Sequence, residues 1–134
     1  MAEPTVAVEL GRIIINEQSP VQIIVLREVG GQRQFPIEIG IPEAWAIERK
    51  IKDVEVPRPM THDLLVNVIE QLGGSLRQVL INNIEGGTFY ARLIVQQGGR
   101  EHSIDCRPSD AVALAVRTSV PILVDRDLFE RLTA

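Results

Sequence analysis

Apolar residues in the first part of the chain follow the period of a β-strand. Residues 5–17 are rich in Val and Ile and partly alternate with polar positions, up to the break at Ser19-Pro20. Residues 21–29 and 34–39 repeat this pattern on either side of Gly30-Gly31, a pair that tolerates the positive φ of tight hairpin turns. The pattern therefore predicts one strand followed by a β-hairpin.

After residue 40 the apolar residues change to the spacing of a helix. Pro42 suits the first turn of a helix that we expect to end near residue 53. Ala44, Ile47 and Ile51 share one face of this helix, with Trp45 beside them. Residues 54–60 contain two prolines and are expected to form an extended connection. A second helix is predicted from an N-cap at Thr61 to the Gly73-Gly74 pair, on apolar residues at helical spacing: Leu65, Val68, Ile69 and Leu72.

The second half of the chain begins with three predicted strands at residues 76–84, 88–96 and 101–106, which paired glycines separate into an antiparallel meander. Pro108 then opens a helix whose run 111–116 is apolar all round, so we expect it to be buried on several sides. Residues 120–124 predict a last strand, and Asp125 can cap a short final helix that ends at Leu132.

These elements come in blocks of strands and blocks of helices, which favours the α+β class over a doubly wound sheet. The 134 residues suit a single domain, residues 1–134, large enough to bury roughly two thirds of the surface of the unfolded chain. We therefore expect mostly antiparallel strands around a buried helix.

Composition narrows the setting of this domain. No run of ~18 apolar residues occurs, the first residues do not resemble a signal peptide, and the single cysteine, Cys106, has no partner for an internal disulfide. These features favour a soluble protein of the cytoplasm. The net charge of -4 is divided evenly along the chain, so a basic stripe for nucleic-acid phosphates would have to come from folding.

The densest group of reactive side chains lies at residues 104–114, where a strand should end and a helix begin. Asp105 alternates onto the polar face of the strand, and Arg107 is held extended by the proline that follows it. Ser109 and Asp110 fall in the first helical turn, where free amides and the helix dipole favour negative charge. Two carboxylates, a guanidinium and a hydroxyl therefore share a small volume.

Two interpretations of this junction remain open from the residues alone. In the first, Asp105 and Asp110 hold Mg²⁺ or another divalent cation that activates water, while Arg107 steadies a phosphate. In the second, Asp110 only complements the helix terminus, and Arg107 pairs with Asp105 or Asp110 to fix the junction.

A second charged segment contains Arg58, His62 and Asp63 at the start of the second predicted helix. A histidine there can transfer protons near neutral pH, or it can simply be an exposed residue at a helix start. His102 shares its strand face with apolar residues and is expected to be a satisfied core histidine. Cys106 lies on the same face and is expected to be an inert buried thiol.

Four segments together resemble a known family: RPMTHDLL at residues 58–65, GGTFYARL at 86–93, IDCRPSDAVALAVR at 104–117 and PILV at 121–124. The chain is similar to the bifunctional nuclease domain along nearly its whole length. The resemblance implies a roll-like α+β domain that cleaves RNA and DNA and forms a homo-oligomer, with a dimer as the first expectation.

On these motifs, the implied nuclease site has Asp105, Asp110, Asp63 and His62 as catalytic residues, with Asp105 and Asp110 as the hypothetical metal ligands. Arg107, Arg58 and Ser109 are the expected contacts to the substrate. The alternative function is a non-catalytic domain that recognises a protein or an anionic ligand at the same helix N-terminus. A third possibility is that the charged residues only lock the core or a subunit interface.

Overall fold

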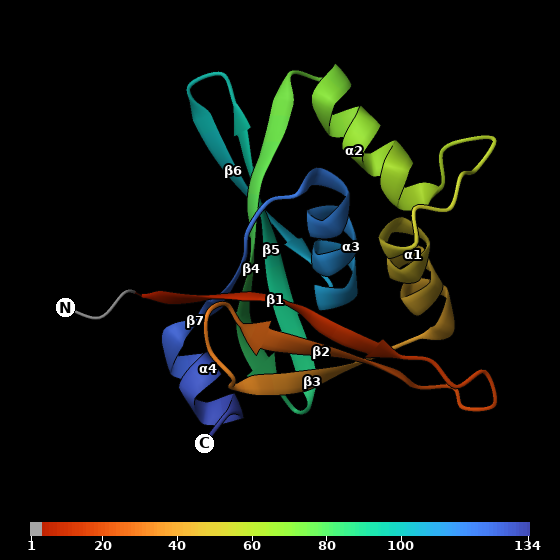
Figure 1. Cartoon of the computed structure of the whole chain (residues 1–134). Helices are drawn as coiled ribbons and strands as arrows, with labels where there is room; N and C mark the ends of the chain where they lie inside the picture. The colour runs from red at the N-terminus through yellow and green to blue at the C-terminus, as the bar shows by residue number, and fades with distance from the viewer. Residues whose placement is uncertain (1–3) are drawn as a thin grey trace.

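The computed structural model describes residues 4–134, in which seven strands and four helices alternate in blocks (Figure 1). The strands are β1 (Thr5–Ile14), β2 (Gln22–Glu28), β3 (Gln34–Ile39), β4 (Gly74–Glu85), β5 (Thr88–Gln97), β6 (Arg100–Cys106) and β7 (Ile122–Asp125). The helices are α1 (Ile41–Ile51), α2 (Thr61–Gln71), α3 (Pro108–Thr118) and α4 (Arg126–Leu132). The predicted α+β class is confirmed.

All seven strands belong to one sheet with the order β3-β2-β1-β7-β4-β5-β6. The predicted β2–β3 hairpin and the β4–β5–β6 meander are both present and antiparallel. The short strand β7 joins these two halves, antiparallel to β1 and parallel to β4. The last strand of the chain therefore lies at the centre of the sheet.

The sheet curls, so that its two halves meet on one side. Phe35 of β3 and Phe89 of β5, which are five places apart in the strand order, stack with ring centroids 6.2 Å apart. Phe129 of α4 meets Phe35 edge to face at 6.1 Å. The curled sheet encloses α3, which Figure 1 shows between the two groups of strands.

The core is organised around α3. Its residues 111–115 are all at most 2% exposed and contact both halves of the sheet through small and branched side chains. Burying a residue such as Leu114 contributes roughly 1.5–3 kcal/mol. The prediction that this helix is buried on several sides is confirmed.

Helix α1 packs on α3 through fewer residues than its pattern predicted. Ala44 and Ile47 are fully buried, but Ile51 is 52% exposed. The expectation that Ile51 shares the buried face is wrong, because α1 ends at this residue and the whole connection that follows is exposed. Trp45 is also largely exposed.

Helix α2 begins at Thr61, so the predicted N-cap is wrong by one residue. Met60 is the cap residue, and its backbone N–H donates to the carboxylate of Asp63 at 3.0 Å, so the side chain of Asp63 closes the start of the helix. No residue of α2 is buried, and its outer face is apolar: Leu64, Leu65, Val68 and Leu72 are all exposed.

Polar side chains and the sheet edge account for two further departures. β1 ends at Ile14 rather than at residue 17, because the buried Gln22 side chain bonds the backbone of Asn16 and Ser19 and holds them in a turn. His102 is not a core histidine: it is half-buried and bonds Gln97, since β6 lies at the edge of the sheet. None of the helices between residues 4 and 134 has the length and apolar character needed to span a bilayer.

Candidate functional site

Side chains from the first turns of α1 and α2 contact the start of α3, and each of these helices carries an acidic residue in its first turn. These residues are Glu43 in α1, Asp63 in α2 and Asp110 in α3. Acidic side chains stabilise a helix N-terminus because they complement its partial positive charge. The cap residues of α1 and α3 form no side-chain capping bond, so amides at both helix starts stay available to a ligand.

Asp110 is the centre of this arrangement. Its Oδ1 is 3.0 Å from His62 Nε2 and also accepts from Arg107 at 3.0 Å, while its Oδ2 accepts from Arg107 Nε at 3.0 Å. A further N–H of Arg107 donates to Glu43 Oε1 at 2.8 Å. We call the residues Glu43, His62, Arg107 and Asp110 the junction cluster.

The junction cluster fixes the charge of Asp110. The hydrogen bond from His62 and the bonds from Arg107 hold the pKa of Asp110 well below its usual range, although burial acts in the opposite direction. The bond to Asp110 likewise raises the pKa of Arg107. At neutral pH this carboxylate is therefore an acceptor only.

This charge state assigns the tautomer of His62. Because an ionised Asp110 can only accept, His62 Nε2 must carry the proton, and in a neutral ring Nδ1 is then the free acceptor. The His62 side chain is 13% exposed. The pair is a histidine oriented by a carboxylate, the arrangement that positions general bases in hydrolases.

Asp63, the other predicted catalytic carboxylate of α2, lies apart from this cluster. It bonds Arg117 Nε at 2.8 Å, and Arg117 also donates to the carbonyls of Ala46 and Ala113. Burial acts to raise the pKa of Asp63, but the Met60 N–H and Arg117 outweigh it, so the pKa lies below its usual value. Arg117 thus ties α1, α2 and α3 together, and Asp63 anchors it.

The structure does not bring Asp105 to the junction cluster. Ala91 and Leu93 of β5 face α3 in the core, so Arg92 between them and its cross-strand neighbour Asp105 face the other side of the sheet. Asp105 is 73% exposed and lies 3.8 Å from Arg92. Asp105 and Asp110 therefore do not converge as ligands of one metal ion would.

No group of three or more His, Cys, Asp or Glu side chains within residues 4–134 has the arrangement of a metal site. The residues present thus do not fit the divalent cation that was predicted at Asp105 and Asp110. Arg58 lies in the exposed connection before α2 and forms no ion pair with any described residue.

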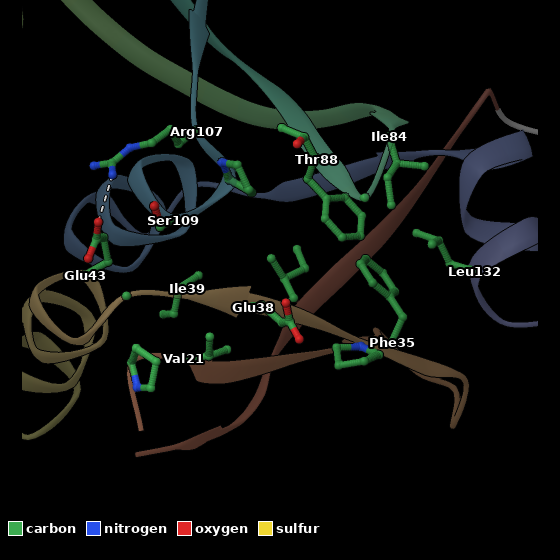
Figure 2. A pocket seen from close by; sticks show the side chains of 17 residues that line it. Val21, Phe35, Glu38, Ile39, Glu43, Ile84, Thr88, Arg107, Ser109 and Leu132 are labelled. Carbon is green, nitrogen blue, oxygen red and sulfur yellow. Dashed lines mark hydrogen bonds and ion pairs between the residues drawn. The ribbon is translucent and has the colours of Figure 1, made fainter. Parts of the chain in front are cut away.

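A groove of about 710 Å³ opens beside the junction cluster, between β3 and the β4–β5 turn (Figure 2). Arg107, Glu43 and Ser109 form its polar end, where Figure 2 shows the bond between Arg107 and Glu43. Its walls are largely apolar and include Val21, Phe35, Ile37, Ile39, Ile84, Phe89 and Leu132. A cavity of this size is typical of small-ligand sites.

Sequence reasoning missed Glu43 and Arg117, which both contribute to this region. An acid directly after Pro42 was visible as a first-turn residue, but nothing in the sequence pairs it with Arg107, 64 residues later. Cys106 is half-buried, where the sequence predicted a buried thiol; burial and the nearby charges of Asp110 and Asp105 raise its pKa to about 12, which disfavours the reactive thiolate at neutral pH.

Comparisons with known proteins match most of this chain. The model of the family described as Bifunctional nuclease domain matches residues 24–134. An uncharacterised protein of Mycobacterium tuberculosis is 48% identical over 103 residues, which cover 77% of this chain and 61% of that protein. Bifunctional nuclease 2 of Oryza sativa subsp. japonica is 34% identical over 118 residues, covering 85% of this chain and 36% of the rice protein. The chain therefore spans less than two thirds of the length of these relatives.

Proposed function

The chain belongs to the bifunctional nuclease domain family, and from this premise we propose that it hydrolyses phosphodiester bonds of RNA and DNA at the junction cluster. The observation that carries the proposal is the 3.0 Å bond between His62 and Asp110, directly beside the guanidinium of Arg107. The histidine, oriented by an ionised carboxylate, can accept a proton, and the neighbouring guanidinium can bind the phosphate.

His62 acts as the general base in this proposal. Nδ1 takes a proton from the attacking water, and Asp110 stabilises the imidazolium that forms, because its charge is fixed close to Nε2. The leaving oxygen lies opposite the attacking water in an in-line displacement, so it takes a proton from solvent, and the imidazolium afterwards releases its proton to solvent. General acid–base catalysis of this kind contributes roughly 10²–10⁴-fold to a rate.

Arg107 supplies the positive charge for the phosphate. Three of its five N–H groups are bound by Asp110 and Glu43, and the side chain is 62% exposed, so the remaining N–H groups can reach a bound phosphate. Its fixed position offsets the negative charge that builds up on the phosphoryl oxygens in the transition state. Asp110 and Glu43 serve as positioning residues for this guanidinium.

The two histidines of the chain provide a matched test. Single-stranded RNA and DNA oligonucleotides with a fluorophore and a quencher should be cleaved by the purified chain. His62→Gln should lower the rate at least about 100-fold, while His102→Gln, on the surface of β6, should keep it within about twofold. Equal activity of His62→Gln and the wild type would exclude this site.

Asp105 and Asp110 can be tested separately because they face opposite sides of the sheet. Asp110→Asn should lower the rate, and Asp105→Asn should not. The opposite result would favour the metal site predicted from the sequence, and parallel assays with EDTA and with added Mg²⁺ test the divalent cation directly. The predicted role of Arg58 as a substrate contact is tested by Arg58→Ala in the same assay.

A non-catalytic binding domain is the second candidate, and one observation favours it. Arg107 is already held by two carboxylates, which also lock α1 to α3 without any ligand. This reading predicts no turnover under any metal condition, together with stabilisation of the fold by a bound ligand.

A homodimer and a cytoplasmic location remain part of the proposal. The exposed apolar face of α2, with Leu64 and Leu72 at its two ends, is the surface that a second copy would cover. Light scattering of the purified chain should give a dimer mass, and Leu72→Glu should give a monomer. A monomer for the wild type would remove this part of the proposal.

A further inference from the structure

Ser109 presents an unpartnered hydroxyl at the polar end of the groove. The residue is only 5% exposed, lines the groove, and forms no side-chain hydrogen bond with any residue of the range 4–134. The buried side-chain atoms without a hydrogen-bond partner in this range include Glu43 Oε2 but not Ser109 Oγ, so Oγ is accessible. The Ser109 hydroxyl is therefore free to bind a group that enters the groove.

Other donors surround this hydroxyl. Ser109 is the second residue of α3, where the backbone N–H has no partner within the helix, and the cap residue Arg107 adds no side-chain cap. Arg107, which has N–H groups left unused by Asp110 and Glu43, also lines the groove. This concentration of donors at a helix N-terminus matches the oxygens of an anionic group.

Charges of both signs lie around this end of the groove. Glu43 and Asp110 carry two negative charges, Arg107 carries one positive charge, and the N-termini of α1 and α3 each contribute about half a positive charge. The exposed Glu38 in the groove wall adds a further negative charge, so an anion would be held by the hydrogen-bond donors of Ser109 and Arg107 and not by the net charge of the groove.

The rest of the groove fits a flat apolar body. The exposed Val21, the half-buried Phe89 and the side chain of Ile37 line it, and Figure 2 shows Val21 and Ile39 across from Thr88 and Ile84. An added β-strand is not favoured there, because Pro36 removes one backbone donor from the open edge of β3. The groove therefore accepts a ligand with an anionic end and a ring system.

We propose that this groove binds one unpaired nucleotide of the substrate, with its phosphate on Ser109 and Arg107 and its base between Val21 and Phe89. The inference rests on the proposed nuclease function, to which it adds a base subsite. A base can enter the groove only when it is out of a duplex, so cleavage should favour single strands over double strands of the same sequence.

Binding is tested without turnover, by calorimetry on the full chain carrying His62→Gln. The probes are the four ribonucleoside 5′-monophosphates, inorganic phosphate, adenosine and laurate. Laurate is an anion that carries an alkyl chain in place of a nucleoside. At least one monophosphate should bind more than tenfold more tightly than inorganic phosphate. Ser109→Ala should weaken this binding about tenfold, while the exposed Ser75→Ala on β4 should not change it.

A second pair of variants tests the base subsite. Val21→Trp fills the groove from an exposed position, and Val29→Trp places the same ring at an exposed position that does not line the groove. Val21→Trp should abolish the advantage of the nucleotide over inorganic phosphate, and Val29→Trp should leave it intact. The same Val21→Trp change, with His62 restored, should lower cleavage of single strands.

The outcomes separate this inference from the nuclease proposal. Monophosphates that bind no better than inorganic phosphate, or binding of laurate alone, would overturn the base subsite even if cleavage at His62 is established. Binding that depends on Ser109 and Val21 would support the subsite even if no cleavage were detected.

Discussion

Replacing Asp110 by Asn removes the charge on which the junction cluster depends while keeping the shape of the side chain. The wild-type carboxylate accepts three hydrogen bonds, two from Arg107 and one from His62. An Asn side chain has one acceptor oxygen, and its NH₂ group would face the N–H donors of Arg107. With the Asn oxygen in the place of Oδ1, the bonds from His62 and from one N–H of Arg107 are kept but lose the carboxylate charge, and the bond from Arg107 Nε to Oδ2 is lost.

The structure sets the size of the effect. Arg107 is 62% exposed, so each of its bonds contributes only about 0.5 kcal/mol, as in a surface ion pair. The His62 bond is more buried, with side-chain exposures of 13% and 23%, and contributes about 1–1.5 kcal/mol. Losing one Arg107 bond and about half the strength of the two bonds that remain should thus lower the free energy of unfolding by about 1–1.5 kcal/mol, or the Tm by roughly 4 °C for a chain of this length.

The effect should depend on pH in a defined direction. The pKa of Asp110 is lower in the folded than in the unfolded state, so its contribution to stability is complete above the unfolded pKa, about 3.9. It is lost as the pH falls through the folded pKa. The stability difference between wild type and Asp110→Asn should therefore be present at pH 5 and shrink below about pH 4.

Urea unfolding at pH 7, 5, 4 and 3 measures this difference, with Asp105→Asn as the matched control. Asp105 is 73% exposed and only 3.8 Å from Arg92, so its variant should change stability by less than about 0.5 kcal/mol at every pH. Equal stability of the two variants at pH 7, or a difference that grows as the pH falls, would refute the reasoning.

Three further predictions concern the surroundings of the site. Leu114→Ala should cost about 3 kcal/mol in urea unfolding, because it leaves a cavity in the fully buried centre of α3; a loss below 1 kcal/mol would contradict the assigned core. Arg117→Lys should lower the free energy of unfolding by about 2 kcal/mol, since an ammonium cannot replace the donors that reach Asp63, Ala46 and Ala113. Full stability of this variant would show that the bonds of Arg117 to the three helices do not stabilise the fold. Cys106 should react with a disulfide reagent at pH 8 roughly a thousandfold more slowly in the folded chain than after denaturation, because its pKa is raised to about 12; equal rates would place the thiol at the surface.

Local sequence patterns correctly predicted most helices and strands. They failed where contacts between distant residues determine the end or the burial of an element. The glycine pairs and the change from strand to helix spacing located the hairpin, the meander and α3 to within a few residues. The end of β1 was missed because a buried side chain from β2, Gln22, captures the backbone of residues 16–19. His102 was assigned to the core because alternation shows which residues share a face, but not whether anything covers that face.

The candidate site shows the same division. Asp110, Arg107 and His62 were identified from the charged residues around two helix starts, since such residues are set by local helix chemistry. The sequence could not show that Asp110 contacts His62, 48 residues away. Nor could it show that Arg107, which bonds Asp110, also bonds Glu43. Asp63 and Asp105 looked equivalent to Asp110 in sequence, yet one anchors Arg117 and the other lies on the far side of the sheet.

The sequence by itself determined that residues 104–114 form a strand end followed by a buried helix, because proline, alternation and a continuous apolar run act over a few residues. Only the tertiary structure decided that Glu43 of α1 and His62 of α2 contact this junction and that a groove opens beside Ser109. The reason is that convergence depends on the curl of the sheet and the central place of β7, and no local pattern specifies either of them.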